Sequence, residues 1–593
     1  MHLGYKPSKY KDTVYKSYFI AKSYREDNKV LKQIIMKIGK LSDKQASQIK
    51  LICKIVSNPS KIITTLENIK TEACKQFLDL AISNSLWEEW KLSHVFQAHS
   101  TNSELNTGII AKILTLNRCT DPCSHYSIPE WVKNTALPEI MNHSLEKLND
   151  DKIYYELDKI QENQENLENH LFKMTYNKDK ESYNFINYDL SSSYFVGMKC
   201  KLSAYGKSKD DKSKNKQVLL GILVNDKGYP FKWEVYPGNT PEVDTLISHV
   251  DACKNRFKLK KITMVFDRGI VSDENLKYIT DKKLKYISAM DKPQIPNIEG
   301  IERSIFKNIT LLNFKENLLE QKFCYYDDAL YFKDLGILKG RRYVLGFNPV
   351  LFEEEKKCRN EKIVFFENFI SGKNKELMQA DRSRNHKSTE QAIINELKRL
   401  KIKKYFENPN LQEIKIEKTN KKGKKRIINS FQITIEKKQA KIEESDNLDG
   451  VCVFVSNHSE YNPDKKSFIF SPEKIIKAYR DKTKIEDAFK HIKSFIKLRP
   501  FHVNTDQHVR AVYSICVLSY FLNKDLAERR KIAEGIDYLN SHNLYEPFRN
   551  CSYVTIRDKT TNIKKSEVVE LTNEQKLLLK NLNLKIRMPQ NYV

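Results

Sequence analysis

Short apolar runs separated by polar turns occupy the middle of the chain, a pattern that predicts β-strands. The runs lie at residues 183–189, 219–225, 230–236, 261–267 and 284–290. The second and third flank the turn at residues 226–228, Asp-Lys-Gly, which predicts a hairpin. A helical pattern at 241–257 precedes the fourth run. The order of three strands, a helix, a strand, a helix and a strand predicts a mixed α/β sheet.

The N-terminal part of the chain has a different pattern. Two β-prone runs, Tyr15–Arg25 and Lys29–Gly39, surround Asp27 and Asn28 and predict a hairpin. Helical periodicity follows from residue 42 to about residue 172. We therefore expect a helical N-terminal region that starts with a β-hairpin.

Four further segments carry separate expectations. The Lys-rich stretch after residue 295 favours strands, with one helix at Ser388–Leu400. The basic sequence Lys421–Arg426 predicts a hairpin turn that either contacts phosphate or is a solvated tip. The polar loop Lys207–Lys216 is expected to be flexible, with DNA contact as the alternative. The apolar run Ala511–Leu522 is too short to span a bilayer, so we expect a buried helix and no membrane partner.

The segment Ser471–Pro500 has the pattern of a single helix. Ser471 is a capping residue, Pro472 suits the first turn, and Arg499 and Pro500 end the pattern. At about 100° per residue, one face carries four polar or aromatic side chains beside an apolar stripe. They are Tyr479, Lys482, Glu486 and Lys493. A charged strip of this kind is usually a solvated face, so a function for Glu486 depends on acids elsewhere.

Two aspartates come directly after apolar runs. Asp189 closes the first predicted strand and Asp267 closes the fourth. In this strand order the first and fourth strands are commonly neighbours, so the two carboxylates are expected to face one position. Helix capping or turn formation is the alternative role for each aspartate.

The composition favours a large polyanion as partner. Lysine and arginine number 103 against 76 aspartates and glutamates, a formal net charge of +27. Such an excess along the chain favours nucleic acid, although codon bias in an AT-rich genome is an alternative source of lysine. The eleven cysteines show no disulfide-like rhythm, and the opening MHLGYKPSKYKD has no apolar core, so we expect a cytoplasmic protein.

Three carboxylates converging on one position would suit divalent metal. Hard oxygen ligands bind Mg²⁺, for which Mn²⁺ is expected to substitute, and two such ions promote in-line displacement at phosphate. The three charges also repel one another when no metal is bound. The sequence therefore predicts Asp189, Asp267 and Glu486 as a metal site for phosphoryl transfer.

The chain resembles a DDE transposase of the insertion-sequence-four superfamily, most closely its bacterial insertion-sequence-1634 group. Several blocks carry the resemblance in family order: YFIAKSYREDNKVLKQIIMKIGKL, YDLSSSYFVG, VNDKGYPFKWEVYPGNTPEVDTL, MVFDRGIVSDENL, the Asp449–Gly450 pair, and YRDKTKIEDAFKHIKSFIKLRPFHV. Together they touch most of the chain from about residue 18 to residue 522. The order of these blocks is the specific signal, since FDRG alone would be weak.

The resemblance implies an RNase H-like catalytic core with Asp189, Asp267 and Glu486 as its metal-binding triad. The family signature around the last acid is Tyr, two residues, Arg, three residues, Glu, six residues and Lys. Tyr479, Glu486 and Lys493 match it, but Lys482 stands at the arginine position and Arg480 lies two residues early. Arginine can bind phosphate through two parallel hydrogen bonds from its planar guanidinium, whereas lysine carries a compact point charge. Bidentate phosphate binding at this position is therefore in doubt.

The remaining implied contacts are with DNA. Tyr479, Arg480, Lys482 and Lys493 are expected to hold the DNA strand. Arg268 is expected to face DNA or support the site, with an ordinary salt bridge as the alternative. The long segment between the second and third acids resembles the β-rich insertion with which this superfamily handles the DNA end.

The implied activity is that of an insertion-sequence transposase. Such an enzyme cuts the ends of its element and joins the freed 3′-hydroxyl to target DNA. The implied partners are terminal inverted repeats, target DNA and a second copy of the chain in a synaptic homodimer, in the bacterial cytoplasm and on the nucleoid. A decayed DNA-binding repressor and a stand-alone RNase H-like nuclease are the alternatives.

These expectations divide the chain into five regions. The regions are a DNA-end-binding, helical region at 1–175, the first part of the core at 176–295, a β-rich insertion at 296–468, the final part of the core with the Glu486 helix at 469–525, and a C-terminal helical extension at 526–593.

Overall fold

The computed structural model describes residues 1–10, 13–27, 29–56, 64–97, 99, 103–196, 199–206, 215–297, 314–419, 425–498, 501–536 and 543–589. These residues form two compact units, each assembled from separate stretches of chain. The first unit contains Met1–Ser85, Pro129–Glu146 and Tyr545–Val593. The second unit contains Leu86–Ile128 and Lys147–Leu544, and therefore all of the predicted site residues.

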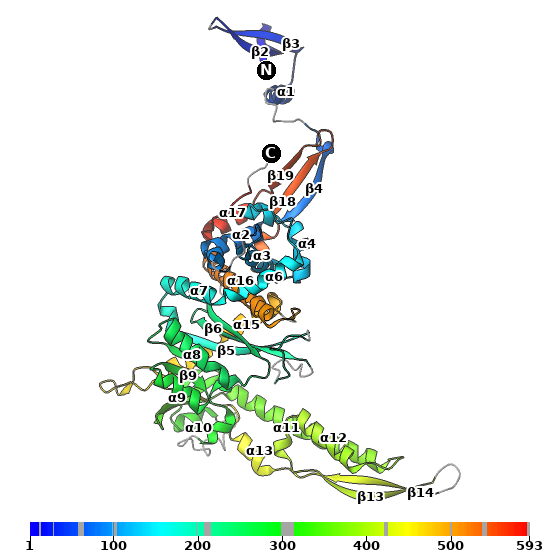
Figure 1. Ribbon diagram of the computed structural model, residues 1–593, viewed down its shortest axis with the longest axis vertical. Helices are drawn as coiled ribbons and strands as arrows, with labels where there is room; N and C mark the ends of the chain where they lie inside the picture. Colours follow the sequence, from blue (N-terminus) through cyan, green and yellow to red (C-terminus); the bar gives the residue numbers. More distant parts are fainter. Residues whose placement is uncertain are drawn as a thin grey trace. The chain divides into compact units, whose positions relative to one another are not determined.

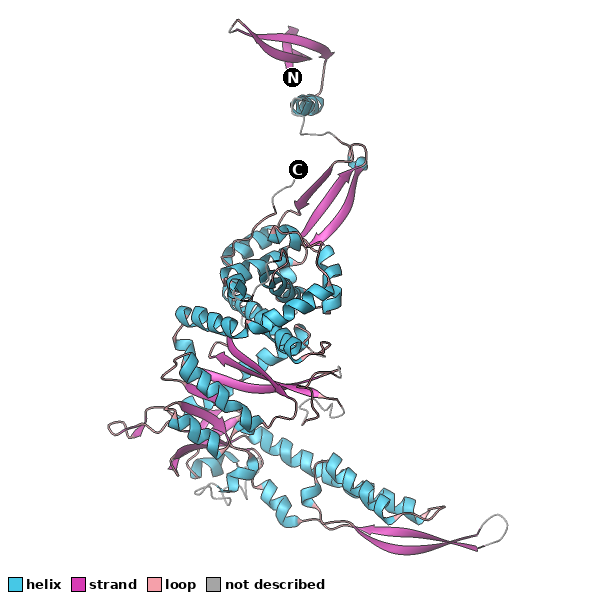
Figure 2. Cartoon of the chain, in the orientation of Figure 1, coloured by secondary structure: helices cyan, strands magenta, loops and turns pink. Residues whose placement is uncertain are grey.

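A nine-stranded mixed sheet forms the centre of the second unit (Figure 2). Its strands, in spatial order, are β10 (Cys324–Asp327), β11 (Leu330–Leu338), β12 (Arg341–Phe347), β15 (Val451–Ser456), β9 (Lys285–Ala289), β8 (Thr263–Phe266), β5 (Phe185–Tyr194), β6 (Gln217–Asn225) and β7 (Pro230–Pro237). Strands β5, β8 and β9 are parallel, and the other neighbouring pairs are antiparallel. The predicted mixed sheet is confirmed, and β5 and β8 are direct neighbours as expected.

Helices cover both faces of the central strands, which explains why these strands are apolar along their length. On one face, α8 (Leu246–Asp251) and α9 (Asp273–Asp281) pack against a core that includes Tyr188 and Phe266. On the other face, α14 (Pro472–Arg480) packs over Val265 and Phe454 through Ile475 and Ile476. The hydrophobic effect on both faces thus fixes the strands that carry Asp189 and Asp267.

The chain between β12 and β15 forms a separate lobe, here called the insertion lobe (Figure 1). Its elements are α11 (Pro349–Met378), α12 (His386–Arg399), β13 (Asn410–Thr419), β14 (Lys425–Thr434) and α13 (Gln439–Asp446). In Figure 1, α11 and α12 run beside the β13–β14 ribbon, and the lobe has its own core around Phe366, Ile393 and Phe431. The lobe leaves and rejoins the sheet at adjacent points, since Phe347 pairs with Val451.

The predicted β-rich insertion needs two corrections. Strands β10, β11, β12 and β15 belong to the central sheet rather than to a separate insertion. The lobe itself contains the 30-residue helix α11, which we did not expect, besides α12 at the predicted position. Charged residues separate the apolar positions of α11, so its pattern is weak. The flanks of the predicted turn at Lys421–Arg426 form the β13–β14 hairpin, but residues 420–424 lie outside the described residues.

A helical layer completes the second unit. It contains α3 (Thr107–Thr120), α6 (Asp150–Glu162), α7 (Gln164–Lys178) and α16 (Asp506–Glu534). Helix α16 packs against α3 and α6 and is buried along Ala511–Leu522, as predicted. In the described part of the chain, no helix combines the length and apolar character needed to span a bilayer. Short elements of this unit include α10 (Phe314–Glu320), α15 (Thr483–Lys490), β16 (Tyr461–Asn462) and β17 (Ser467–Phe468).

The first unit contains two small antiparallel sheets. One sheet is formed by β1 (His2–Tyr10), β2 (Thr13–Glu26) and β3 (Lys29–Gly39), followed by α1 (Asp43–Val56). The predicted hairpin is therefore present as β2 and β3, and β1 adds a strand that we did not expect. The other sheet is formed by β4 (Ile69–Gln76), β18 (Ser552–Asp558) and β19 (Lys564–Val568). Helices α5 (Leu137–Met141) and α17 (Asn573–Asn581) lie wholly in this unit, whereas the unit boundaries fall within α2 (Leu78–Glu89) and after the first residue of α4 (Ile128–Lys133).

This second sheet corrects two helical expectations. Strand β4 lies inside the N-terminal region predicted to be helical, and β18 and β19 lie inside the predicted C-terminal helical extension. Strand β4 gains its partner from β18, far away in sequence. Because strand pairing of this kind depends on tertiary contacts, a local pattern does not reveal it.

Candidate active site

Two predicted acids lie side by side across parallel strands. Tyr188 of β5 is in register with Phe266 of β8, so the next residues, Asp189 and Asp267, follow at the same level of the sheet. Both also lie on the face against which α14 and α15 pack, because side chains alternate along a strand. The expectation that Asp189 ends its strand is wrong. Strand β5 continues to Tyr194, since β6 supplies hydrogen-bonding partners for the serines that follow Asp189.

The third predicted acid is on α15, after a break in the predicted helix. Helix α14 ends at Arg480 and α15 begins at Thr483, so the single helix predicted from Ser471 to Pro500 is wrong. Between them the backbone tightens: the Lys482 N–H donates to Tyr479 O at 3.2 Å and the Ile485 N–H to Lys482 O at 2.9 Å. The segment then ends in a π-helical turn at residues 491–495.

The two ends of the predicted helix also differ from expectation. Pro472 occupies the first turn as predicted, but the Ser471 side chain makes no capping hydrogen bond. The predicted stop at Arg499 and Pro500 lies outside the described residues.

Lys482 lies among the three acids. Its ammonium nitrogen Nζ is 3.3 Å from Asp267 Oδ1 and 3.3 Å from Glu486 Oε1, and only 10% of its side chain is exposed. Burial alone would lower the pKa of Lys482, but the carboxylates of Asp267, Asp189 and Glu486 outweigh burial and raise it. The lysine is therefore charged at neutral pH.

Asp267 has an asymmetric set of partners. Its Oδ1 accepts hydrogen bonds from the Arg268 N–H at 2.9 Å and from the Tyr479 hydroxyl at 3.1 Å, besides the Lys482 contact. Burial favours the neutral acid, yet Lys482, the Arg268 N–H and Tyr479 together hold the pKa of Asp267 below its usual value. In the described residues, Oδ2 makes no hydrogen bond. One oxygen of an ionised carboxylate is thus left for another ligand.

A cleft of about 610 Å³ opens beside these groups. It is lined by Asp267, Glu486, Tyr479, Lys482, Arg268, Arg480, and residues of β9, β15 and the start of the insertion lobe, including Asn348 and Leu351. Asp189 is buried, with 9% of the residue exposed, and is not among the residues that line the cleft. The sequence did not predict the contribution of Asn348 and Leu351, because they lie at least 81 residues from every one of the three acids.

The cationic residues predicted to contact DNA have different surroundings. Arg480 lines the cleft but pairs with Asp327 of β10. Arg268 pairs with Asp291, 3.2 Å from Nε to Oδ1, with about half of its side chain exposed. Lys493 is buried in the π-helical turn and does not line the cleft. The structure therefore brings Arg268, Arg480 and Lys482 to the cleft, and Lys493 lies apart from it.

The metal-binding capacity of this site depends on Lys482. Carboxylate oxygens are the donors that Mg²⁺ prefers, and the free Oδ2 of Asp267 suits that role. No group of three His, Cys, Asp or Glu side chains within the described ranges is arranged to hold a metal ion. The ammonium of Lys482 contacts two of the three candidate carboxylates. The carboxylate oxygens are suitable ligands for Mg²⁺, but in this structure those of Asp267 and Glu486 contact the ammonium of Lys482.

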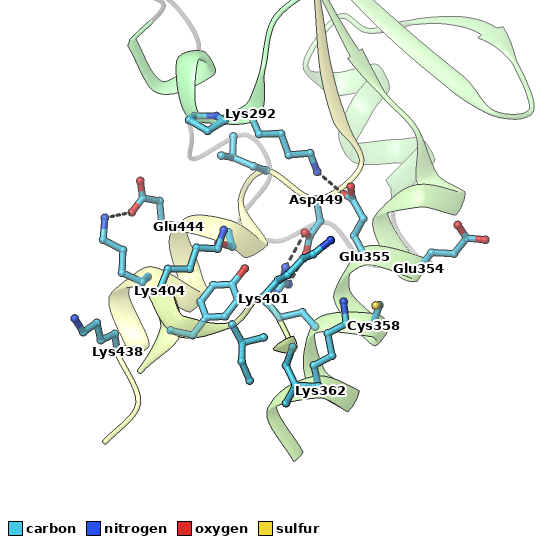
Figure 3. A pocket seen from close by; sticks show the side chains of 18 residues that line it. Lys292, Glu354, Glu355, Cys358, Lys362, Lys401, Lys404, Lys438, Glu444 and Asp449 are labelled. Atoms are coloured by element: carbon cyan, nitrogen blue, oxygen red, sulfur yellow. Dashed lines mark hydrogen bonds and ion pairs between the residues drawn. The ribbon is translucent and has the colours of Figure 1, made fainter. Parts of the chain in front are cut away.

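A second cavity of about 810 Å³ lies at the base of the insertion lobe (Figure 3). Its lining is mainly basic, with Lys292, Arg359, Lys362, Lys401, Lys404, Lys438 and Lys441 against four acids. Figure 3 shows Lys292 turned toward Glu355, with which it pairs. In the described part of the chain, Lys362 and Lys401 have no ion-pair partner, so this surface keeps positive charge. The Lys-rich composition was the only signal for it in the sequence.

The N-terminal residues of the chain are similar to a known family of proteins. Residues 3–61, which contain β1 to β3 and α1, match the model of the IS1634 family transposase, N-terminal domain. The N-terminal domain is that of an IS1634 family transposase. This match confirms the resemblance predicted from the sequence. No protein among the curated sequences matches the chain.

Three solved structures are similar to parts of the chain. The first is the piggyBac transposase synaptic complex with hairpin DNA, at 9% identity and a TM-score of 0.33, covering 79% of this chain and 76% of that one. The Mos1 transposase paired-end complex with left transposon end has 11% identity and a TM-score of 0.14, covering 30% and 57%. A pre-cleavage Mos1 transpososome has 12% identity, the same TM-score, and covers 30% and 58%. Scores of this size do not establish a shared fold.

Proposed function

We propose that this protein is a DDE DNA transposase of an insertion sequence, which cuts the ends of its element and joins the 3′-hydroxyl to target DNA. The observation that carries the proposal is the meeting of three acids from separate elements. Asp189 on β5, Asp267 after β8 and Glu486 on α15 all lie close enough to one buried lysine to raise its pKa. The IS1634-type N-terminal domain supports the same conclusion independently.

The topology supports an RNase H-like core for this enzyme. In chain order, the strands β5, β6, β7, β8 and β9 occupy the spatial order β7-β6-β5-β8-β9. The first three are antiparallel, and the last two continue the sheet in parallel with the first. This is the mixed order expected of the core, with the two aspartates on its central pair of strands. The four strands beyond β9 would then be an elaboration of this family member.

The chemistry proposed for the site is in-line displacement at phosphorus. Divalent metal held by Asp189, Asp267 and Glu486 would activate the attacking water or 3′-hydroxyl and stabilise the leaving oxygen. Tyr479 fixes the orientation of the Asp267 carboxylate through its hydroxyl hydrogen bond. The pKa of Tyr479 is raised by burial and by Asp267, so the phenol keeps the proton that it donates.

DNA is the partner that the charge distribution favours. Arg268 and Arg480 at the cleft, together with the basic cavity of the insertion lobe, provide cationic groups suited to a phosphate backbone. We also propose that two copies act on two element ends. Light scattering of the protein with and without end DNA tests that assembly directly.

A strand-transfer assay tests the function. Purified protein and Mg²⁺ are incubated with DNA that carries the terminal repeats found beside the gene, and the products are compared with those of Asp189→Asn and Asp267→Asn. We expect end cleavage and joining by the native protein and neither reaction by the variants. Cutting without regard to sequence would identify a nuclease instead, and binding without cutting would identify a repressor. Lys357→Gln, an exposed change on α11, is the matched control.

A further inference from the structure

Lys482 has an unusual position for a lysine expected to hold DNA. Its ammonium lies 3.3 Å from oxygens of both Asp267 and Glu486, and its side chain is nine-tenths buried. Three carboxylates close together repel one another, and this positive charge reduces the repulsion. The lysine therefore does for the metal-free site part of what a metal ion would do.

We propose that Lys482 is an internal counter-ion that holds the metal-free active site together and competes with divalent metal for its carboxylates. This inference rests on the proposed function, because it concerns the same acids. Lys482 contacts the very groups proposed to bind metal, and two cations at one small site repel strongly. Metal entry then requires the ammonium to withdraw from Asp267 and Glu486.

The local structure allows this withdrawal. Lys482 stands in the tight turn between α14 and α15, so its side chain does not interlock with the turns of a continuous helix. Lysine carries a compact, strongly hydrated charge on a flexible four-carbon chain, whereas arginine would hold a carboxylate with a rigid fork. The departure from the family pattern at this position thus suits a cation that must leave.

The neighbouring Lys484 provides a matched control. It lies two residues further on, in the first turn of α15, but its Nζ pairs with Asp226 at 3.0 Å and with Asp481 at 3.7 Å. Its exposure is greater than that of Lys482, and it contacts none of the three candidate metal ligands. Removal of its charge should therefore leave metal binding unchanged.

Calorimetric titration of the full chain with Mn²⁺, without DNA, tests the proposal. We expect Lys482→Met to bind Mn²⁺ about tenfold more tightly than the native protein, equivalent to about 1.4 kcal/mol. Lys482→Gln should show the same direction, and Lys484→Met should match the native protein. The melting temperature of Lys482→Met should be lower than native in EDTA, and the difference should shrink when Mn²⁺ is added. Lys482→Gln preserves the test if the methionine variant does not fold.

Two results would overturn the proposal in different ways. Equal Mn²⁺ affinity in the native protein and both Lys482 variants, with binding lost in Asp267→Asn, would refute the competition and leave the metal site intact. Mn²⁺ binding that is absent throughout, or that Asp267→Asn does not affect, would refute the proposed metal site and with it the role of Lys482.

Discussion

The buried ion pair between Arg359 and Asp449 joins the first half of α11 to the end of the insertion lobe, two residues before β15, and we expect its loss to destabilise the lobe. Arg359 lies on α11, and its Nη1 donates to Asp449 Oδ1 at 2.8 Å. Its Nη2 bonds to the second Asp449 oxygen and to Asp446. The side chains of Arg359 and Asp449 are only 7% and 4% exposed, so water cannot replace either partner.

The size of the effect follows from this burial. Two unit charges about 3 Å apart attract by about 5 kcal/mol at an effective dielectric constant of about 20, and much of this gain offsets the cost of removing both charges from water. Removal of one partner leaves the other charge buried, which typically costs about 3 to 5 kcal/mol. Burial already raises the pKa of Asp449 beside Arg359, so protonation of Asp449 limits the cost. We expect Arg359→Met to destabilise the lobe by about 3 kcal/mol.

Hydrogen exchange of the α11 amides measures this local free energy. The double variant Arg359→Met with Asp449→Leu should lose less protection than Arg359→Met alone, because it leaves no buried charge. The control is the exposed ion pair between Lys357 and Glu361 on the same helix, whose charged atoms are 4.0 Å apart. Removal of this pair should lower the local free energy of unfolding by less than about 0.5 kcal/mol. Unchanged protection in Arg359→Met, or a double variant as unstable as the sum of the single variants, would refute the reasoning.

Three further predictions concern separate parts of the fold. Burial lowers the pKa of His125 to about 3, whereas the pKa of histidine in an unfolded chain is about 6.5. The unfolded chain therefore binds the proton first as the pH is lowered, and the free energy of unfolding decreases as the pH falls from about 6.5 to about 3. At pH 4.5 the loss is about 2.7 kcal/mol, and His125→Gln should reduce the drop in melting temperature between pH 7 and pH 4.5. Gly450→Ala should lower the melting temperature, with a cost of more than about 1 kcal/mol, because φ is +66° and the new Cβ would lie 2.5 Å from Asn348 O; an unchanged melting curve would contradict this. Tyr479→Phe removes the hydrogen bond to Asp267, so Mg²⁺-dependent DNA cleavage should fall about tenfold while the melting temperature changes little, and full activity would argue against a role for the hydroxyl.

The sequence predicts the parts of the fold that depend on short-range patterns. The apolar runs that end near Asp189 and Asp267 identify two strands, and the order of elements makes them neighbours, as the structure shows. The break at Asp481 and Lys482 was not predictable in this way, because helical periodicity continues through a turn that contains neither glycine nor proline. The pairing of β4 with β18 could not be predicted from the local pattern either, because the two strands lie far apart in the sequence.

In the candidate site too, the residues could be predicted from the sequence, whereas their contacts could not. Residue types and spacing identify Asp189, Asp267 and Glu486 as metal-ligand candidates, and their roles stay predictions. The resemblance to the family signature placed Lys482 at the arginine position, and it was therefore expected to contact DNA. Its contact with Asp267 depends on how α14 and α15 pack on the sheet, and that packing is a tertiary property.

The two ends of the insertion lobe meet at one point of the sheet. Phe347 and Val451 are paired across β12 and β15, and the Asn348 N–H donates to Gly450 O at 2.7 Å. Strands β12 and β15 are antiparallel neighbours, so the insertion lobe connects them in the same way as the loop of a β-hairpin would, whatever its length. Evolution can therefore lengthen, shorten or exchange the lobe without shifting the register of the strands that carry the two aspartates. The core and the insertion lobe are therefore free to diverge at separate rates.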